Sequence, residues 1–170
     1  MNILRVDFHE LYRRHLCRHG QFGINLWHIL AVYGIYFSIC SLAAVAVRTL
    51  LPQATALDQS LVLAAMFLPY LAVLVRNIPV PVMLLTVLSA VILILAAVST
   101  QSIPFWLHVI MIPVWHRVQL ISHRRYILRR DMSAFDSRYR KGRTLFLLLA
   151  VYELPILLHY LAFGRKDWVR

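Results

Sequence analysis

Residues 80–98, VPVMLLTVLSAVILILAAV, form a continuous apolar stretch that contains no charged side chain. A helix of this length rises about 28 Å at about 1.5 Å per residue, close to the ~30 Å thickness of the hydrocarbon core of a bilayer. The stretch therefore predicts a transmembrane helix.

Apolar runs of similar length lie on both sides of this stretch, at about 25–47, 57–75, 103–121 and 145–163. Hydrophobic residues make up 61% of the chain and charged residues 15%, and the mean hydropathy is +0.69. Soluble domains are only about 45–50% apolar and about 25% charged, which excludes a soluble protein. We expect an all-α integral membrane helical bundle of four to five transmembrane helices, formed as a single domain by residues 1–170.

Residues 1–22 differ from these spans in their pattern. Leu4, Phe8, Leu11 and Leu16 recur at helical spacing with arginines between them, which is typical of an amphipathic helix that lies in the membrane interface. The sequence between Gly20 and Gly23 interrupts this helix before the first span begins. The segment is too polar for the apolar region of a signal peptide, so we expect no cleavable signal peptide.

The net charge of +11 is concentrated beside the apolar runs. Four arginines precede the first span, and nine Lys or Arg residues lie from Arg117 to Arg143, most of them in a basic loop at 122–143. Four intervening spans would place both regions on one membrane face, which the positive-inside rule makes cytoplasmic. We expect anionic lipid headgroups as partners and no nucleic acid.

The last apolar segment, 145–163, has two interpretations. A fifth full span would carry Arg165 and Lys166 to the face opposite the basic loop, against the positive-inside rule. A re-entrant segment would keep them on the basic side. We favour five full spans, with the re-entrant segment as the alternative.

Five of the eight histidines lie near the predicted cytoplasmic face: His15, His19, His28, His116 and His123. His15 and His19 have the i, i+4 spacing at which two imidazoles bind one ion, and His116 and His123 fall within ~20° of one helix face. Imidazole is the commonest protein ligand of catalytic metals, so we predict a metal site formed by these five residues. The alternative is that they contact lipid headgroups or backbone carbonyls.

The remaining three histidines and the one carboxylate inside a span lead to separate predictions. We expect His9 to be exposed, and His108 and His159 to face each other as a buried hydrogen-bonded pair. Glu153 is the one carboxylate well inside a span, which makes it a candidate functional residue. Its alternative role is to pair with an arginine or histidine of a neighbouring helix.

Three short motifs follow one another along the chain. Tyr12 and His15 precede the segment His19-Gly-Gln-Phe-Gly-Ile-Asn25-Leu-Trp-His28, Gln119 lies four residues before His123, and Glu153 comes before the end of the last apolar run. This order resembles the small membrane 2-hydroxy-fatty-acid dioxygenases, the fungal α-oxidation enzymes and their bacterial relatives. The chain departs from the family pattern at three points: Ser122 replaces a glycine, Ile127 replaces an acidic residue, and Asn25 is three residues from His28 where the family has four.

The resemblance implies an iron(II)-dependent dioxygenase that uses O2 to shorten a 2-hydroxy fatty acid by one carbon. It implies His19, His28 and His123 as catalytic ligands, Tyr12 and Gln119 as substrate-binding residues, and Asn25 as a further site residue. The carboxylate of such a lipid matches the bidentate hydrogen bonds of arginine. For this role we predict Arg117, Arg124 and Arg125.

Two other functions remain open from the sequence. A di-iron histidine-rich lipid hydroxylase or desaturase would need about eight nitrogen or carboxylate ligands near one face, more than the chain offers. A non-enzymatic lipid-binding membrane protein would need none. In each case we expect an integral membrane protein, in the inner membrane of a bacterium or the endoplasmic reticulum of a eukaryote, with its site facing the cytoplasm.

Overall fold

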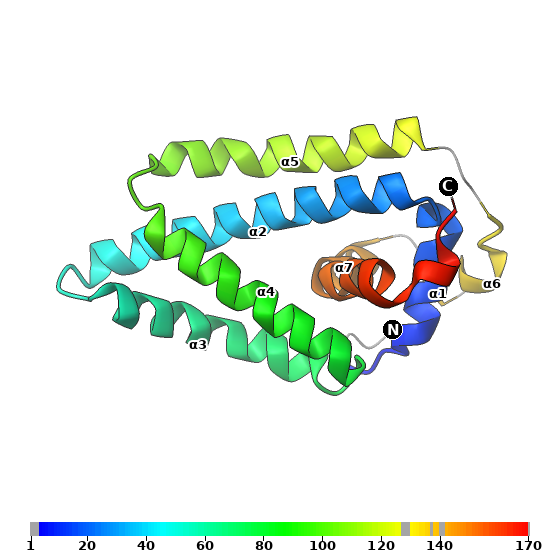
Figure 1. The fold of residues 1–170 in the computed structure, drawn as a ribbon, viewed down its shortest axis with the longest axis horizontal. Coiled ribbons are helices and arrows are strands. Elements are labelled where there is room, and N and C mark those ends of the chain that lie inside the picture. Colours follow the sequence, from blue (N-terminus) through cyan, green and yellow to red (C-terminus); the bar gives the residue numbers. More distant parts are fainter. Residues whose placement is uncertain (1–3, 127–129, 137, 140–141, 170) are drawn as a thin grey trace.

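The computed structural model describes residues 4–126, 130–136, 138–139 and 142–169, and these residues are almost entirely helical. Ile127 and parts of the basic loop lie outside the described residues. The prediction of an all-α fold is confirmed. In chain order, the elements (Figure 1) are α1 Phe8–His19, α2 Phe22–Leu50, α3 Ala56–Leu74, α4 Val80–Ser99, α5 Phe105–Arg125, α6 Ser133–Asp136, α7 Arg143–Phe163 and the 3-10 helix η1 Arg165–Asp167.

Four of the described helices are long and apolar enough to cross a membrane: α2, α3, α4 and α7. They cover the predicted apolar runs 25–47, 57–75, 80–98 and 145–163, with boundaries that differ by at most three residues. The prediction of an integral membrane helical bundle is therefore confirmed.

Helix α5 corresponds to the predicted span 103–121 but does not belong to these four helices, because polar residues such as Arg117 lower its hydropathy. Figure 1 shows that α5 runs alongside α2 for most of the length of α5. Large apolar side chains on α5 are exposed, whereas its buried residues are all polar: His108, Gln119 and Ser122. This inversion fits a helix whose outer face contacts lipid and whose inner face contacts polar groups of the bundle.

Helix α1 closes one end of the bundle. It begins after Asp7, whose side chain accepts a hydrogen bond from the backbone N–H of Glu10 at 3.1 Å. Leu11 and Tyr12 are buried in a core that includes residues of α7. The apolar face that the sequence assigns to the lipid interface therefore packs against protein, and the helix starts later than predicted.

Helix α7 has a different direction from its neighbours. Figure 1 shows α2 and α5 in the plane of the view, whereas α7 is seen nearly end-on, beside α1. Leu145, Tyr152 and Tyr160, which are spread along α7, share one core with α1 and the α3–α4 turn. Helix α7 thus crosses the bundle at the end that α1 covers.

The C-terminal segment returns from α7 to the corner between α1 and α2. The backbone N–H of Val169 donates to the carbonyl of Gly20 at 2.9 Å, and that of Phe22 donates to the carbonyl of Val169 at 3.1 Å. Arg165 and Lys166 therefore lie at the same end of the molecule as α1. This position is the one that the re-entrant alternative expects, whereas the length and hydropathy of α7 are those of a full span. The favoured fifth span therefore stays a prediction.

The connections between helices gather at two opposite ends. At one end, the backbone N–H of Val6 donates to Asn77 Oδ1 in the α3–α4 turn at 2.9 Å. The backbone N–H of Arg130, after α5, donates to the Cys17 carbonyl at 2.9 Å at this same end. We call it the basic end, defined by α1, the α3–α4 turn, the segment after α5 and the C-terminal segment.

Candidate metal centre

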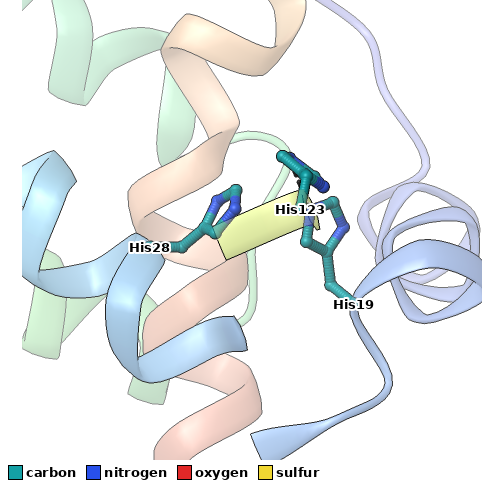
Figure 2. A group of neighbouring side chains, drawn as sticks. All are labelled: His19, His28 and His123. Atoms are coloured by element: carbon teal, nitrogen blue, oxygen red, sulfur yellow. Dashed lines mark hydrogen bonds between the residues drawn. The ribbon is translucent and has the colours of Figure 1, made fainter. Parts of the chain in front are cut away.

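Three histidines from three helices converge at the basic end. His19 ends α1, His28 lies in the second turn of α2, and His123 lies in the last turn of α5. One ring nitrogen of each lies within 4.8 Å of those of the other two. The ring centroids are 4.7 to 4.8 Å apart, and Figure 2 shows the rings turned toward one another. The structure thus brings together the three histidines that the sequence predicts as catalytic.

The corner between α1 and α2 is fixed by Asn25. Its side-chain amide donates to the carbonyl of Gln21 at 2.9 Å and also to the carbonyl of His19. The bond to His19 satisfies a carbonyl at the end of α1, where the helix leaves it without a partner, and the bond to Gln21 lies at the start of α2. Asn25 is fully buried, so the predicted site residue acts by holding His19 close to the start of α2.

A close approach of the chain after α5 brings His123 to the same corner. A Cβ atom at Gly23 would lie 2.3 Å from the hydroxyl of Tyr126, so a larger residue there would displace that ring. Tyr126 directly follows α5, and its position against α2 places the last turn of α5 beside His28.

Glu153 lies behind His28. Its Oε1 is 3.1 Å from His28 Nδ1 and accepts a hydrogen bond from Gln119 Nε2 at 3.1 Å. The other ring nitrogen, His28 Nε2, is buried and has no hydrogen-bond partner among the described atoms. A carboxylate on one nitrogen of a histidine and a bare second nitrogen is the usual arrangement of a metal-binding imidazole.

His19 is oriented in a similar way by the backbone. Its Nδ1 lies 3.3 Å from the His15 carbonyl, and its Nε2 lies 3.5 Å from His123 Nε2. Burial lowers the pKa of His19 well below its usual value, which keeps the ring neutral at pH 7. Neutral imidazole is the form that binds metal ions.

His15 does not belong to the ligand group, although the sequence predicts it as a ligand. Its Nε2 is 2.7 Å from Asn25 Oδ1, and its ring stacks on that of His19 with centroids 4.3 Å apart. Burial lowers the pKa of His15 to about 4, so it is neutral as well. The i, i+4 spacing therefore stacks the two rings, and His15 packs against His19 instead of binding the ion with it.

His116, the fifth predicted ligand, is also outside the group. It lies two turns before His123 on α5, about 10 Å away along the helix at about 1.5 Å per residue. His116 instead lines the cavity beside the cluster, together with Gln119 and Glu153.

A cavity of about 210 Å³ opens at the histidine cluster, and two arginines of α1 line it, Arg14 and Arg18. The predicted carboxylate-binding residues do not line it and are exposed: Arg117, Arg124 and Arg125. The reason is helix rotation, since residues one, two or six positions from His123 point at least about 100° away from it. The sequence signal for Arg14 and Arg18 was their own i, i+4 spacing beside His15 and His19.

Tyr12, predicted to bind substrate, has a structural role instead. Its hydroxyl donates to Asp167 Oδ2 at 2.8 Å, which ties α1 to the C-terminal segment. Burial raises the pKa of Tyr12, so the hydroxyl keeps its proton. Gln119 does line the cavity, where it holds Glu153.

The predicted pair of His108 and His159 does not form. His108 packs edge-on against Phe37 at 5.6 Å, whereas His159 packs against Tyr12 at 4.6 Å. The prediction was wrong because α7 crosses the basic end, while His108 lies near the start of α5 at the opposite end. His9 is exposed, as expected.

The three-histidine cluster fits a transition-metal ion, because it combines three imidazole nitrogens, one of them buried and without a hydrogen-bond partner among the described atoms, with a carboxylate behind one ring. No family model, no curated protein and no solved structure matches this chain.

Proposed function

We propose that this protein is a membrane-embedded iron(II)-dependent oxygenase that acts on a lipid acyl chain. The most specific form of the proposal is α-oxidation of a 2-hydroxy fatty acid to an acid one carbon shorter. The observation that carries it is the cluster of His19, His28 and His123, with Glu153 behind His28.

The reaction balances with a single O2. The carboxyl carbon of the 2-hydroxy acid leaves as CO2, the hydroxyl-bearing carbon becomes the carboxyl carbon of the shorter acid, and one water forms. Iron(II) held by neutral imidazoles, with coordination positions left open, supplies the binding and activation of O2.

The residues of the chain supply binding and orientation. The Glu153 carboxylate and the His15 carbonyl hold His28 and His19 in the tautomers that offer Nε2 to the ion. Arg14 and Arg18 line the cavity beside the cluster and provide guanidinium donors for the substrate carboxylate.

We assign the site to the cytoplasmic face, because the basic end carries the N-terminal arginines and the segment after α5. The membrane would be the inner membrane in a bacterium and the endoplasmic reticulum in a eukaryote. The acyl chain would reach the site directly from the bilayer.

The metal content of the detergent-purified protein tests the proposal. After expression in iron-supplemented medium, we expect about one iron per chain, bound by the three-histidine cluster. About two irons per chain would favour the di-iron hydroxylase or desaturase instead. Less than about a tenth of an equivalent of any transition metal would contradict the proposal and favour a non-enzymatic lipid-binding protein.

Single substitutions test which histidines hold the ion. His19→Ala, His28→Ala and His123→Ala should each remove bound iron and abolish formation of the shortened acid. Membrane insertion should persist, because the apolar helices drive it. His9→Ala is the matched control on the exposed face of α1 and should retain iron and activity. Equal damage from His9→Ala and His28→Ala would contradict the assignment.

A further inference from the structure

The cavity at the histidine cluster adjoins a second cavity of about 260 Å³. The second cavity continues along α2 and α7, where apolar side chains such as Val32, Ile35 and Phe146 line it. Its ionisable and amide side chains, His116, Gln119 and Glu153, are all residues that it shares with the cavity at the cluster. Four residues line both cavities: His116, Gln119, Leu149 and Glu153.

A third cavity, of about 230 Å³, lies beyond the second and shares Tyr36 and Ala150 with it. Its other lining residues come from α2, α3 and α7 and include Cys40, Phe67 and Leu147. Among the residues that the structure describes, no charged residue lines this third cavity. The row of three cavities, which we call the α2–α7 groove, therefore becomes steadily less polar away from the histidines.

The α2–α7 groove opens sideways from the bundle. Leu147 is 52% exposed and Ala150 is also exposed, and both lie on α7, a helix long and apolar enough to cross a membrane. The Tyr36 hydroxyl donates to the Ala150 carbonyl at 2.8 Å, which fixes α2 to α7 where the second and third cavities meet. A lipid of the bilayer can thus enter from the side without crossing water.

We propose that the α2–α7 groove binds the tail of a long-chain fatty acid. The carboxylate lies at Arg14 and Arg18, and the tail extends past Tyr36 to Cys40 and Phe67. His28 and Cys40 are twelve residues apart on α2, a separation of about 18 Å, so only a long chain reaches the third cavity. The identity of the headgroup rests on the proposed function, whereas the position of the tail rests on the cavities.

Photocrosslinking of metal-free protein in detergent tests this inference. The probe is a long-chain 2-hydroxy fatty acid with a diazirine at its methyl end, and mass spectrometry locates the labelled residues. We expect labels on Cys40, Phe67 and Leu147. An unlabelled long-chain 2-hydroxy acid should displace the probe, whereas a short-chain 2-hydroxy acid and a long-chain alcohol should not.

A blocking variant provides the second measurement. Ala150→Trp fills the junction of the second and third cavities and should lower labelling at Phe67 about tenfold. Ala64→Trp is the matched control, since Ala64 is an exposed alanine of α3 that lines none of the three cavities. Labelling in this control should equal that of the unmodified protein.

Three results would overturn the inference. These are labelling spread evenly over lipid-exposed residues of α3 and α4, unchanged labelling in Ala150→Trp, and displacement of the probe by a phospholipid but not by the fatty acid. Crosslinking needs neither iron nor O2. A protein that binds no iron but labels as expected would contradict the proposed oxygenase and support the binding of the tail in the groove. A protein that binds iron but does not label at the groove would contradict the binding of the tail and leave the proposed oxygenase standing.

Discussion

Glu153 is the residue on which the site depends most. A carboxylate inside an apolar helix is expensive to bury, and such residues pair with other groups or serve a function. Here Glu153 is paired, because it accepts a hydrogen bond from Gln119 and lies 3.1 Å from His28 Nδ1. A carboxylate that holds one nitrogen of a metal-bound histidine orients the ring and strengthens the bond of its other nitrogen to the metal.

The variant Glu153→Gln tests the carboxylate, because it replaces this group by a neutral amide of the same size. Glutamine keeps the size of the side chain and an oxygen that can accept from His28 Nδ1, so the position of the ring should change little. We expect the affinity for iron(II), or for cobalt(II) as a spectroscopic substitute, to fall about 10- to 100-fold in a competition titration with a chelator.

Asp58→Asn is the control for this experiment. Asp58 forms the capping box of α3 with Thr55, at the end of the molecule opposite to the histidines. This variant should lose some thermal stability, about 1 kcal/mol at most, and no metal affinity. Wild-type affinity in Glu153→Gln would show that the carboxylate does not act on the metal site.

For single residues, the sequence indicated which residue types lie near the site. It did not indicate toward which neighbour each side chain points. His19, His28 and His123 could be predicted, because each lies at the predicted end of an apolar run on the same membrane face. The roles of Arg14, Arg18 and His15 could not be predicted, because they depend on how α1 and α5 are rotated about their own axes. Rotation is set by side-chain packing between helices, which the spacing of one helix does not contain.

Between elements, the contact of α5 with α2 determines whether His123 reaches His28. The indole of Trp115 lies directly on Gly34 of α2, where a Cβ atom would be 2.3 Å from Cε2 and Nε1 of that ring. Small residues at such positions let membrane helices approach closely. The aromatic ring on one helix and the glycine on the other together fix the spacing of α2 and α5.

Gly34→Ala should therefore push α5 away from α2. We expect a loss of about 1–3 kcal/mol in stability from overpacking, measured as a lower Tm in detergent, together with weaker metal binding. The double variant Gly34→Ala with Trp115→Leu provides the space that the methyl group needs and should recover most of both losses. If Gly34→Ala alone is neutral, the contact does not control the position of α5.

The elements themselves were largely predictable, because each long apolar run became one helix with nearly the expected boundaries. The direction of α7 was not, since its crossing of the bundle depends on contacts of Leu145, Tyr152 and Tyr160 with residues far away in the sequence. The hydrogen bonds of Val169 with Gly20 and Phe22 were also beyond the reach of any local pattern.

For the whole molecule, the direction of α7 decides which side of the membrane the C-terminal segment faces. If α7 were a full span, the loop before it and the segment after it would lie on opposite faces. In the structure both lie at the basic end, since Arg138 pairs with Glu10 of α1 and Tyr12 bonds to Asp167. The positive-inside rule then gives Arg165 and Lys166 the same side as the N-terminal arginines.

Cysteine labelling in intact cells measures these positions. In a background with Cys17→Ser and Cys40→Ala, single cysteines replace three exposed residues: Ser133, Lys166 and Gln53. We expect an impermeant maleimide to label position 53 from outside the cell, because it follows α2 at the end opposite α1. Positions 133 and 166 should be labelled only after the membrane is opened, because the positive-inside rule predicts that the basic end is cytoplasmic. Labelling of positions 53 and 166 from outside would show that α7 is a fifth full span. Labelling of position 133 from outside would show that the basic end does not face the cytoplasm.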